Sequence, residues 1–291
     1  MLFFTDSEIK MTDEEFPLLR DLIYNYSGLF FSEDNRYLFE RRLSPRLAHR
    51  QLLTFHDYYY YLRYDVSRDQ ELSDIMDILT TNETYFFRES FQLKAFTDEI
   101  VPEIAKAKAK QCDKTIRIWS AGCSTGEEPY TIAMLLLDKP ELAGLKIEII
   151  GTDISQRVLH HARKGMYGSS SFRVTEPHYK NRFFHELDGG YKVGDQIREL
   201  VTFSRLNLYD SSRYLFLGKM DIIFCRNVII YFDMLAKKRV MESFYNTLHP
   251  GGFLLLGHSE SLMNITTAFK LRHFKNDMVY EKPLKFDTVP G

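Results

Sequence analysis

The chain has 291 residues, of which 44% are hydrophobic and 27% charged, and its formal net charge is -2. This length is enough for one large domain or two unequal domains with buried cores. A nearly neutral chain has no overall field that attracts nucleic acid or anionic lipid, so any basic surface must be local. No apolar run has the length of a membrane span, and the opening residues lack the apolar core of an export signal. We therefore expect a cytoplasmic protein that is not inserted in a membrane.

The three cysteines, Cys112, Cys123 and Cys225, are odd in number, and none has C-x-x-C spacing. This pattern indicates neither a disulfide framework nor a zinc site. We expect reduced thiols, with Cys225 acting as a small buried hydrophobic residue.

Residues 12–79 have helical periodicity that no strand pattern interrupts. Thr12, with Glu15 three residues later, predicts a capped helix start, and Gly28 predicts the end of that helix. The Ser44-Pro45 pair predicts either the start of a further helix or a kink in one longer helix. We predict a small helical domain over residues 1–84, a larger domain over 85–285 and a tail over 286–291.

The larger domain begins with a predicted helix over residues 91–110 and then alternates short apolar strands with amphipathic helices. This alternation predicts an α/β fold with a doubly wound, mostly parallel sheet. Near the end, Lys275-Asn276 separates two strand-like stretches, which predicts a hairpin and an antiparallel strand at the sheet edge. Residues 172–203 are too long for a simple connection, and the turn at residues 188–190 predicts an inserted antiparallel β-subdomain.

The loop between the first predicted strand and its helix reads Gly122-x-x-x-Gly126. In open α/β sheets, ligands bind beyond the carboxyl ends of the strands, next to such a loop. The spacing is not the G-x-G-x-x-G that seats a pyrophosphate, and Glu127 and Glu128 would repel phosphate groups. The next strand ends at Asp153, which suits both hydroxyls of a ribose or, alternatively, a helix N-cap. A nucleoside with a cationic amino-acid tail, S-adenosylmethionine, fits this combination.

Five stretches, "TNETYFFRES", "SAGCSTGEEPYTIAM", "GTDIS", "FCRNVIIYFD" and "GGFLLLGHSES", resemble the signatures of the CheR family of chemoreceptor glutamate methyltransferases. The resemblance covers nearly the whole chain. It implies a seven-stranded, Rossmann-like methyltransferase domain and a helical domain that recognises receptors. It also implies S-adenosylmethionine as methyl donor, no metal, and glutamate side chains on the cytoplasmic helices of chemotaxis receptors as acceptors. The product would be a glutamate methyl ester, as in sensory signal transduction.

The resemblance assigns a set of residues to the donor site. These are Asn82, Thr84, Arg88, Gly122, Glu128, Asp153, Asn207, Leu208, Asn227 and Val228. Glu127 is the alternative to Glu128, because only one of two successive helical residues can face the ligand; we expect Glu127 to be solvated at the helix start. Asn207 and the backbone of Leu208 suit an adenine edge, although Asn207 could simply form a turn.

Arg88 and Tyr231 are the predicted catalytic residues. The guanidinium of Arg88 is a natural partner for a carboxylate, either of the donor or of the acceptor. Tyr231 could stabilise the sulfonium or hold the acceptor carboxylate, and its alternative is plain packing. The acceptor, with a pKa near 4.3, is already ionised at neutral pH, so no general base is needed. We expect catalysis from proximity, alignment and a dry pocket, and a structural role for His258.

A cluster of arginines is the predicted docking surface for acidic receptor helices: Arg36, Arg41, Arg42, Arg46 and Arg50. A nucleic-acid backbone would also suit such a cluster, but the strand end "CRNV" is not the N-P-P-[YF]-like motif of base methylation, so we expect no nucleic acid. The resemblance also implies that the β-subdomain of some family members binds a tethering peptide at the receptor's C-terminus. The segment around residues 188–196 is shorter here than in those members, so we expect receptor recognition without a tether. We also expect a monomer. The alternatives to this enzyme are a noncatalytic S-adenosylmethionine-binding scaffold and a methyltransferase with another acceptor.

Overall fold

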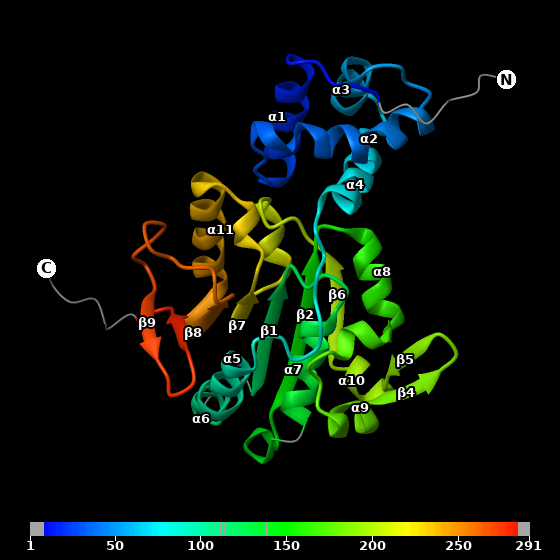
Figure 1. Ribbon diagram of the computed structural model, residues 1–291. Helices are drawn as coiled ribbons and strands as arrows, with labels where there is room; N and C mark the ends of the chain where they lie inside the picture. Colours follow the sequence, from blue (N-terminus) through cyan, green and yellow to red (C-terminus); the bar gives the residue numbers. More distant parts are fainter. Residues whose placement is uncertain (1–8, 111, 113, 138, 285–291) are drawn as a thin grey trace, which may run out of the picture.

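The computed structural model describes residues 9–110, 112, 114–137 and 139–284, and it divides into a helical unit above a large sheet (Figure 1). The helical unit consists of α1 (Glu15–Ser27), α2 (Arg36–His49), α3 (Phe55–Tyr64) and α4 (Arg68–Leu79). Their apolar faces share one core, in which Phe16, Phe39 and Tyr58 are fully buried. The predicted tail over residues 286–291 lies outside the described residues.

The predicted end of α1 at Gly28 is confirmed, and the predicted Thr12–Glu15 contacts form, although the helix itself begins at Glu15, with Glu14 and not Thr12 at the N-cap position. The Glu15 backbone N–H donates to Thr12 Oγ1 at 3.2 Å, and the Thr12 N–H donates to the Glu15 carboxylate at 2.8 Å. Gly28 ends the helix in the left-handed region, at a φ of +74°. Pro45 lies inside α2, so the second of the two readings of Ser44-Pro45, one longer helix, is the right one.

Seven strands of the described chain form the main sheet, in the order β6-β2-β1-β7-β8-β10-β9. Their bounds are β1 (Thr115–Ala121), β2 (Lys146–Asp153), β6 (Val201–Arg205), β7 (Met220–Cys225), β8 (Leu248–Leu256), β9 (Lys270–His273) and β10 (Met278–Glu281). The first five strands in this order pair in parallel, whereas β10 is antiparallel to both β8 and β9. The predicted α/β fold, with its antiparallel element at one edge, is confirmed; β10 is second from that edge and β9 is outermost.

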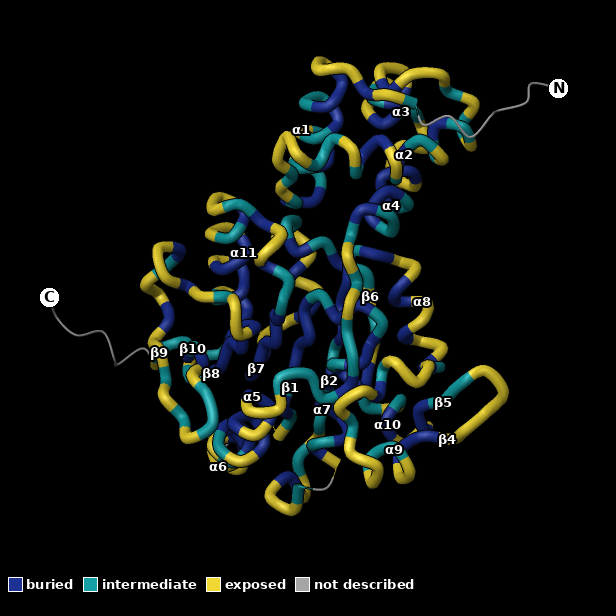
Figure 2. The backbone as a smooth tube through the Cα atoms, viewed as in Figure 1, coloured by how far each residue is buried: buried dark blue, intermediate teal, exposed yellow. Residues whose placement is uncertain are grey.

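Both faces of the sheet are buried: successive strand residues point to opposite sides, and all six residues of β7 are buried. Ile118 of β1 belongs to one apolar core and its neighbour Trp119 to the other. The flanking helices are α7 (Glu127–Leu137), α8 (Gln156–Lys164), α11 (Met234–Thr247) and the continuous run of α5 (Ser90–Ala95), a π-helix at Phe96–Ile100 and α6 (Val101–Lys108). That run confirms the helix predicted over residues 91–110. Figure 2 shows the buried backbone concentrated along the sheet.

The inserted excursion contains a small antiparallel sheet, in the order β3-β5-β4. Its strands are β3 (Met166–Tyr167), β4 (Phe184–Leu187) and β5 (Gly190–Val193), with α9 (Pro177–Phe183) and α10 (Asp195–Arg198) beside them. The β4–β5 hairpin is the predicted one. The small sheet begins at Met166, ahead of the predicted boundary at residue 172, and Val201 already belongs to the main sheet.

The helical unit is attached above the carboxyl ends of the strands. Leu29 forms an antiparallel bridge with Phe232, and the Phe30 N–H donates to the Tyr231 carbonyl at 2.9 Å. The hydroxyl of Tyr24 contacts the carboxylate of Asp233 at 3.1 Å. These contacts hold the unit over the edge of the sheet where ligands of parallel α/β folds bind. None of the helices in the described ranges is long and apolar enough to cross a membrane.

Candidate active site

A cavity of about 310 Å³ lies between the carboxyl ends of the strands, the linker after α4 and the underside of the helical unit. The strands β1, β2, β6 and β7 supply its floor through the loops that follow them. Every residue predicted for the donor site or for catalysis lines this cavity: Asn82, Thr84, Arg88, Gly122, Glu128, Asp153, Asn207, Leu208, Asn227, Val228 and Tyr231. Phe30, Phe31 and Leu38 of the helical unit line it from above.

The glycine loop packs directly against the loop that follows β7. Gly122 has a φ of +80°, and a Cβ at this position would lie 2.5 Å from Cγ2 of Val228. Its N–H and that of Cys123 both donate to the Thr152 carbonyl at 2.8 Å, which fixes the loop to the end of β2. A side chain at position 122 would therefore be strained and would displace Val228.

Asp153 holds the glycine loop and the start of α8 together. Its carboxylate accepts from the backbone N–H of Ser124 and of Ser155, each at 2.9 Å. Burial raises the pKa of Asp153, against these hydrogen bonds, which lower it. The side chain of Ser155, not Asp153, caps α8 by accepting from the Val158 N–H. The N-cap alternative for Asp153 is therefore wrong.

The two adjacent glutamates have different surroundings. Glu128 lines the cavity, accepts from Ser120 Oγ at 2.7 Å and forms an ion pair with Arg226 at 3.0 Å. Glu127 points elsewhere and is 2% exposed; its carboxylate accepts from Thr125 Oγ1 at 2.6 Å and from Ser171 Oγ at 3.1 Å. Burial raises the pKa of Glu127. The expectation of a solvated Glu127 is wrong, because the connection between β3 and α9, which contains Ser171, covers its side chain.

Arg88 lies on a strained turn in the linker. Its neighbours Phe87 and Glu89 have φ angles of +60° and +59°, which are unfavourable for residues with a Cβ. Its Nη1 donates to the Glu83 carbonyl at 3.2 Å, and its guanidinium lies 5.7 Å from the centre of the Tyr85 ring. The hydrogen-bond acceptor of the Arg88 guanidinium within the described chain is therefore a neutral carbonyl.

The remaining linker residues and the rim tyrosine make few polar contacts. Nδ2 of Asn82 donates to Thr80 Oγ1 at 3.2 Å, and the Asn82 carbonyl accepts from Ser124 Oγ at 3.3 Å. Tyr231 is 37% exposed at the cavity edge, beside Phe30 of the helical unit.

Asn207 forms a turn and joins the two units. Its Oδ1 accepts from the Tyr209 N–H at 3.0 Å, and its Nδ2 donates to the Tyr26 carbonyl at 2.6 Å. The turn-forming alternative for Asn207 thus describes what its side chain does in this structure. The backbone of Leu208, its neighbour, also lies at the cavity, although its carbonyl accepts from the Tyr214 hydroxyl.

Glu260 lies in the stretch "GGFLLLGHSES", but no role is assigned to it from the sequence. Its carboxylate accepts from the backbone N–H groups of Asn227 at 2.7 Å, Val228 at 2.9 Å and Gly257 at 2.8 Å. Burial raises the pKa of Glu260, while these N–H groups lower it. Glu260 shapes the loop after β7, where Asn227 has a φ of +58°. Nothing in its spacing from Asn227 could have signalled this long-range contact.

The lining chemistry fits S-adenosylmethionine. Oδ1 of Asn227 is buried without a hydrogen-bond partner in the described chain, so it can accept from a ligand. The lining contains the carboxylates of Glu128 and Asp153 and the guanidinium of Arg88, charged groups complementary to a cationic nucleoside that carries a carboxylate. The described residues contain no group of three or more histidine, cysteine, aspartate or glutamate side chains that could hold a metal ion.

Comparisons with known proteins match the chain to CheR methyltransferases, both by family models and by individual relatives. The family model "CheR methyltransferase, SAM binding domain" matches residues 82–278, and "CheR methyltransferase, all-alpha domain" matches residues 14–80. The chain is 40% identical over 281 residues to chemotaxis protein methyltransferase 2 of Vibrio cholerae, covering 96% of each chain. It is 37% identical over 257 residues to the chemotaxis protein methyltransferase of Borreliella burgdorferi, covering 87% of this chain and 90% of that one.

Proposed function

Because this chain belongs to the CheR methyltransferase family, we propose that it methylates glutamate side chains of chemotaxis receptors, with S-adenosylmethionine as donor. The observation that carries the proposal is that one cavity is lined by every residue that the resemblance assigns to the donor and to catalysis. The relatives are named chemotaxis protein methyltransferases, which supports the pathway.

The donor would lie across the floor of the cavity. Gly122 and the loop after β7 would lie beside the nucleoside, Asp153 would accept from ribose hydroxyls, and Glu128 would face the positive end of the donor. The orphaned Oδ1 of Asn227 would accept one further hydrogen bond. Bound S-adenosylmethionine supplies a methyl group on a positively charged sulfur, which an ionised carboxylate can take without any proton transfer.

The chain's own contribution is to orient the acceptor and to exclude water. Arg88 offers a guanidinium at the cavity, and Tyr231 offers a ring and a hydroxyl at its edge. An acceptor carboxylate held between them would need no general base, and the helical unit would close the cavity over it. Arg88 could instead hold the donor's carboxylate, in which case Tyr231 alone would position the acceptor.

Receptor docking is proposed on α2, with a smaller set of arginines than the sequence indicated. Arg46 and Arg50 are each 2.6 Å from the carboxylate of buried Glu71, so they hold α2 to α4. Arg42 donates to two carbonyls at the end of α4, and Arg36 forms an ion pair with Asp13. The exposed Arg41, which packs beside the Tyr37 ring, is the first residue to test for docking.

The proposal also places the enzyme in the cytoplasm, as a monomer, where receptors expose their acidic helices. Its test is transfer of a tritiated methyl group from S-adenosylmethionine to purified receptor cytoplasmic fragments, followed by release of volatile label in base. The variants are Arg88→Ala and, as a matched control, Arg213→Ala, whose side chain is 65% exposed and pairs with Asp210 outside the cavity.

We expect base-labile label with the wild type and the control, and its loss with Arg88→Ala. Donor binding without transfer to any of the fragments would instead support a noncatalytic scaffold. Label that resists base would point to an acceptor other than a carboxylate.

A further inference from the structure

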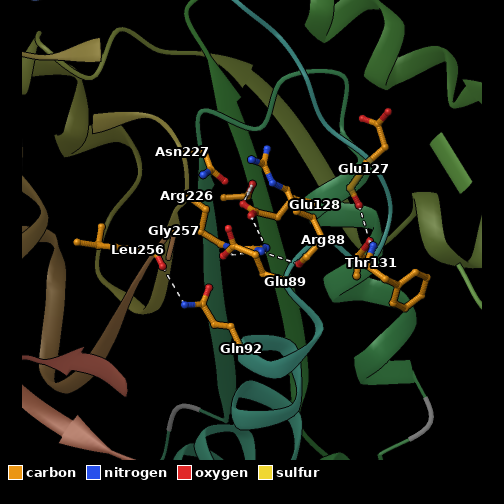
Figure 3. A network of polar contacts seen from close by, with 12 residues as sticks. Arg88, Glu89, Gln92, Glu127, Glu128, Thr131, Arg226, Asn227, Leu256 and Gly257 are labelled. Atoms are coloured by element: carbon orange, nitrogen blue, oxygen red, sulfur yellow. Dashed lines mark hydrogen bonds and ion pairs between the residues drawn. The ribbon is translucent and has the colours of Figure 1, made fainter. Parts of the chain in front are cut away.

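The guanidinium of Arg226 lies almost completely buried at the end of β7, with 3% of its side chain exposed. Nη1 lies 3.0 Å from the Glu128 carboxylate, and Nη2 lies 3.1 Å from the Glu89 carboxylate. Nη2 also donates to the Arg88 carbonyl at 2.6 Å. Figure 3 shows Arg226 between Glu128 and the Arg88-Glu89 turn. A buried cation needs such partners, because an unpaired charge in the interior is strongly unfavourable.

The turn that Arg226 contacts is strained on both sides of Arg88. Phe87 and Glu89 both have left-handed φ angles, and such residues persist only where surrounding contacts hold them. On one side, the Phe87 N–H donates to Thr131 Oγ1 at 3.1 Å. On the other side, Arg226 binds the carbonyl of Arg88 and the carboxylate of Glu89. Arg226 therefore supplies the second anchor of this turn.

The nitrogens of Arg226 already have partners within the chain. Nε lies 3.3 Å from Glu89, Nη1 is bonded to Glu128, and Nη2 is bonded to the Arg88 carbonyl. The group lines the cavity, yet these donors are directed at the protein rather than at a ligand. Its influence on a reaction would therefore pass through Arg88 and Glu128.

We propose that Arg226 is a positioning residue that holds the Arg88 turn and the Glu128 carboxylate at a fixed distance and orientation relative to each other. This inference rests on the proposed function, since it assigns Arg88 to catalysis and Glu128 to the donor. Lysine at this position would keep the charge but could not reach one carbonyl and two carboxylates from a planar fork. The geometry of the guanidinium, and not only its charge, is then what the site requires.

The test compares Arg226→Lys and Arg226→Gln with Arg117→Lys and Arg117→Gln. Arg117 is a matched control because it also binds a carboxylate, that of Glu148 at 3.0 Å, and a backbone carbonyl, that of Lys219 at 3.2 Å. It does not line the cavity. Binding of S-adenosylhomocysteine is measured by calorimetry, and kcat and KM are measured with receptor fragments. Circular dichroism identifies variants that fail to fold.

We expect Arg226→Lys to lower kcat on the order of 100-fold, as a small misplacement of a reacting group does, with KM for the fragment changed by less than about threefold. Arg226→Gln should weaken S-adenosylhomocysteine binding by about tenfold or more, because Glu128 loses the partner that orients it. The Arg117 variants should stay within about threefold of the wild type in both respects. The losses in kcat of Arg226→Lys and Arg88→Ala should be less than additive in the double variant, because part of the effect of Arg226 passes through the Arg88 side chain.

Two results would overturn the inference: equal effects at positions 226 and 117, or additive losses in the double variant. If the wild type transfers no methyl group to any fragment, the proposed function fails. The binding comparison still decides the positioning role in that case, since it needs no acceptor.

Discussion

Gly122→Ala tests the contact between the glycine loop and the loop after β7. The substitution places a Cβ at a φ of +80°, which costs about 1–2 kcal/mol for an L-residue. The Cβ would also lie 2.5 Å from Cγ2 of Val228. Overpacking of this kind adds about 1–3 kcal/mol, so we expect a total loss of roughly 2–5 kcal/mol in the free energy of unfolding.

Gly144→Ala is the matched control for this change. Gly144 has the same φ of +80°, but no atom lies within 4 Å of the position of its Cβ. Gly144→Ala should therefore lose only the backbone part, about 1–2 kcal/mol. The difference between the two variants isolates the contact with Val228.

Urea unfolding, followed by the fluorescence of the single, fully buried Trp119, measures both losses. Calorimetric titration with S-adenosylhomocysteine gives the second readout, because a displaced Val228 deforms the cavity. We expect affinity to fall by about tenfold or more for Gly122→Ala and to stay unchanged for Gly144→Ala. If the two variants lose the same stability and bind the ligand equally well, the two loops do not pack as described.

The other predictions concern charge, thiols and docking. Burial opposes ionisation of Glu71, but hydrogen bonds from two arginines and a tyrosine outweigh it and lower its pKa below 4.5. The contribution of the ionised Glu71 to stability is therefore fully present above about pH 4.5 and is lost as the pH falls through the lower folded pKa. Urea unfolding at pH 7 should show that Glu71→Gln lowers the free energy of unfolding by about 3 kcal/mol, and this loss should shrink as the pH falls below 4.5. Burial raises the pKa of the Cys123 and Cys225 thiols, whereas Cys112 is exposed. A thiol reagent should therefore label only Cys112 rapidly before urea is added. Rapid labelling of all three cysteines in the folded protein would contradict the packing around Cys123 and Cys225. Arg41→Glu should raise KM for receptor fragments by about threefold or more at low salt, and an effect that persists in high salt would argue against electrostatic docking.

The sequence was sufficient where function depends on the end of a strand. Gly122 and Asp153 follow buried strands, and parallel strands bring their carboxyl ends to one edge of the sheet, so both residues could be placed before the structure was known. The structure confirms the doubly wound sheet and shows both residues at one cavity. Periodicity carries this information because it reflects burial on both faces of each strand.

The sequence was insufficient where a side chain meets a distant partner. Spacing placed Arg46 and Arg50 on one face of a helix, but it could not show that Glu71 lies between them and neutralises that face. It also left Glu127 in solvent, because the segment that covers it comes from Ser171 and its surroundings. The anchoring of the loop after β7 by Glu260 depends in the same way on tertiary contact, which no local pattern encodes.

The central claim, methyl ester formation on receptor glutamates, is tested most directly by peptide mass spectrometry. A purified receptor cytoplasmic fragment is incubated with the enzyme and S-adenosylmethionine, digested, and compared with a sample made without donor. We predict a one-methyl mass increase on glutamate side chains that mild base removes. A fragment without any added methyl group, or with a methyl group on lysine or another non-carboxylate side chain, would contradict the account.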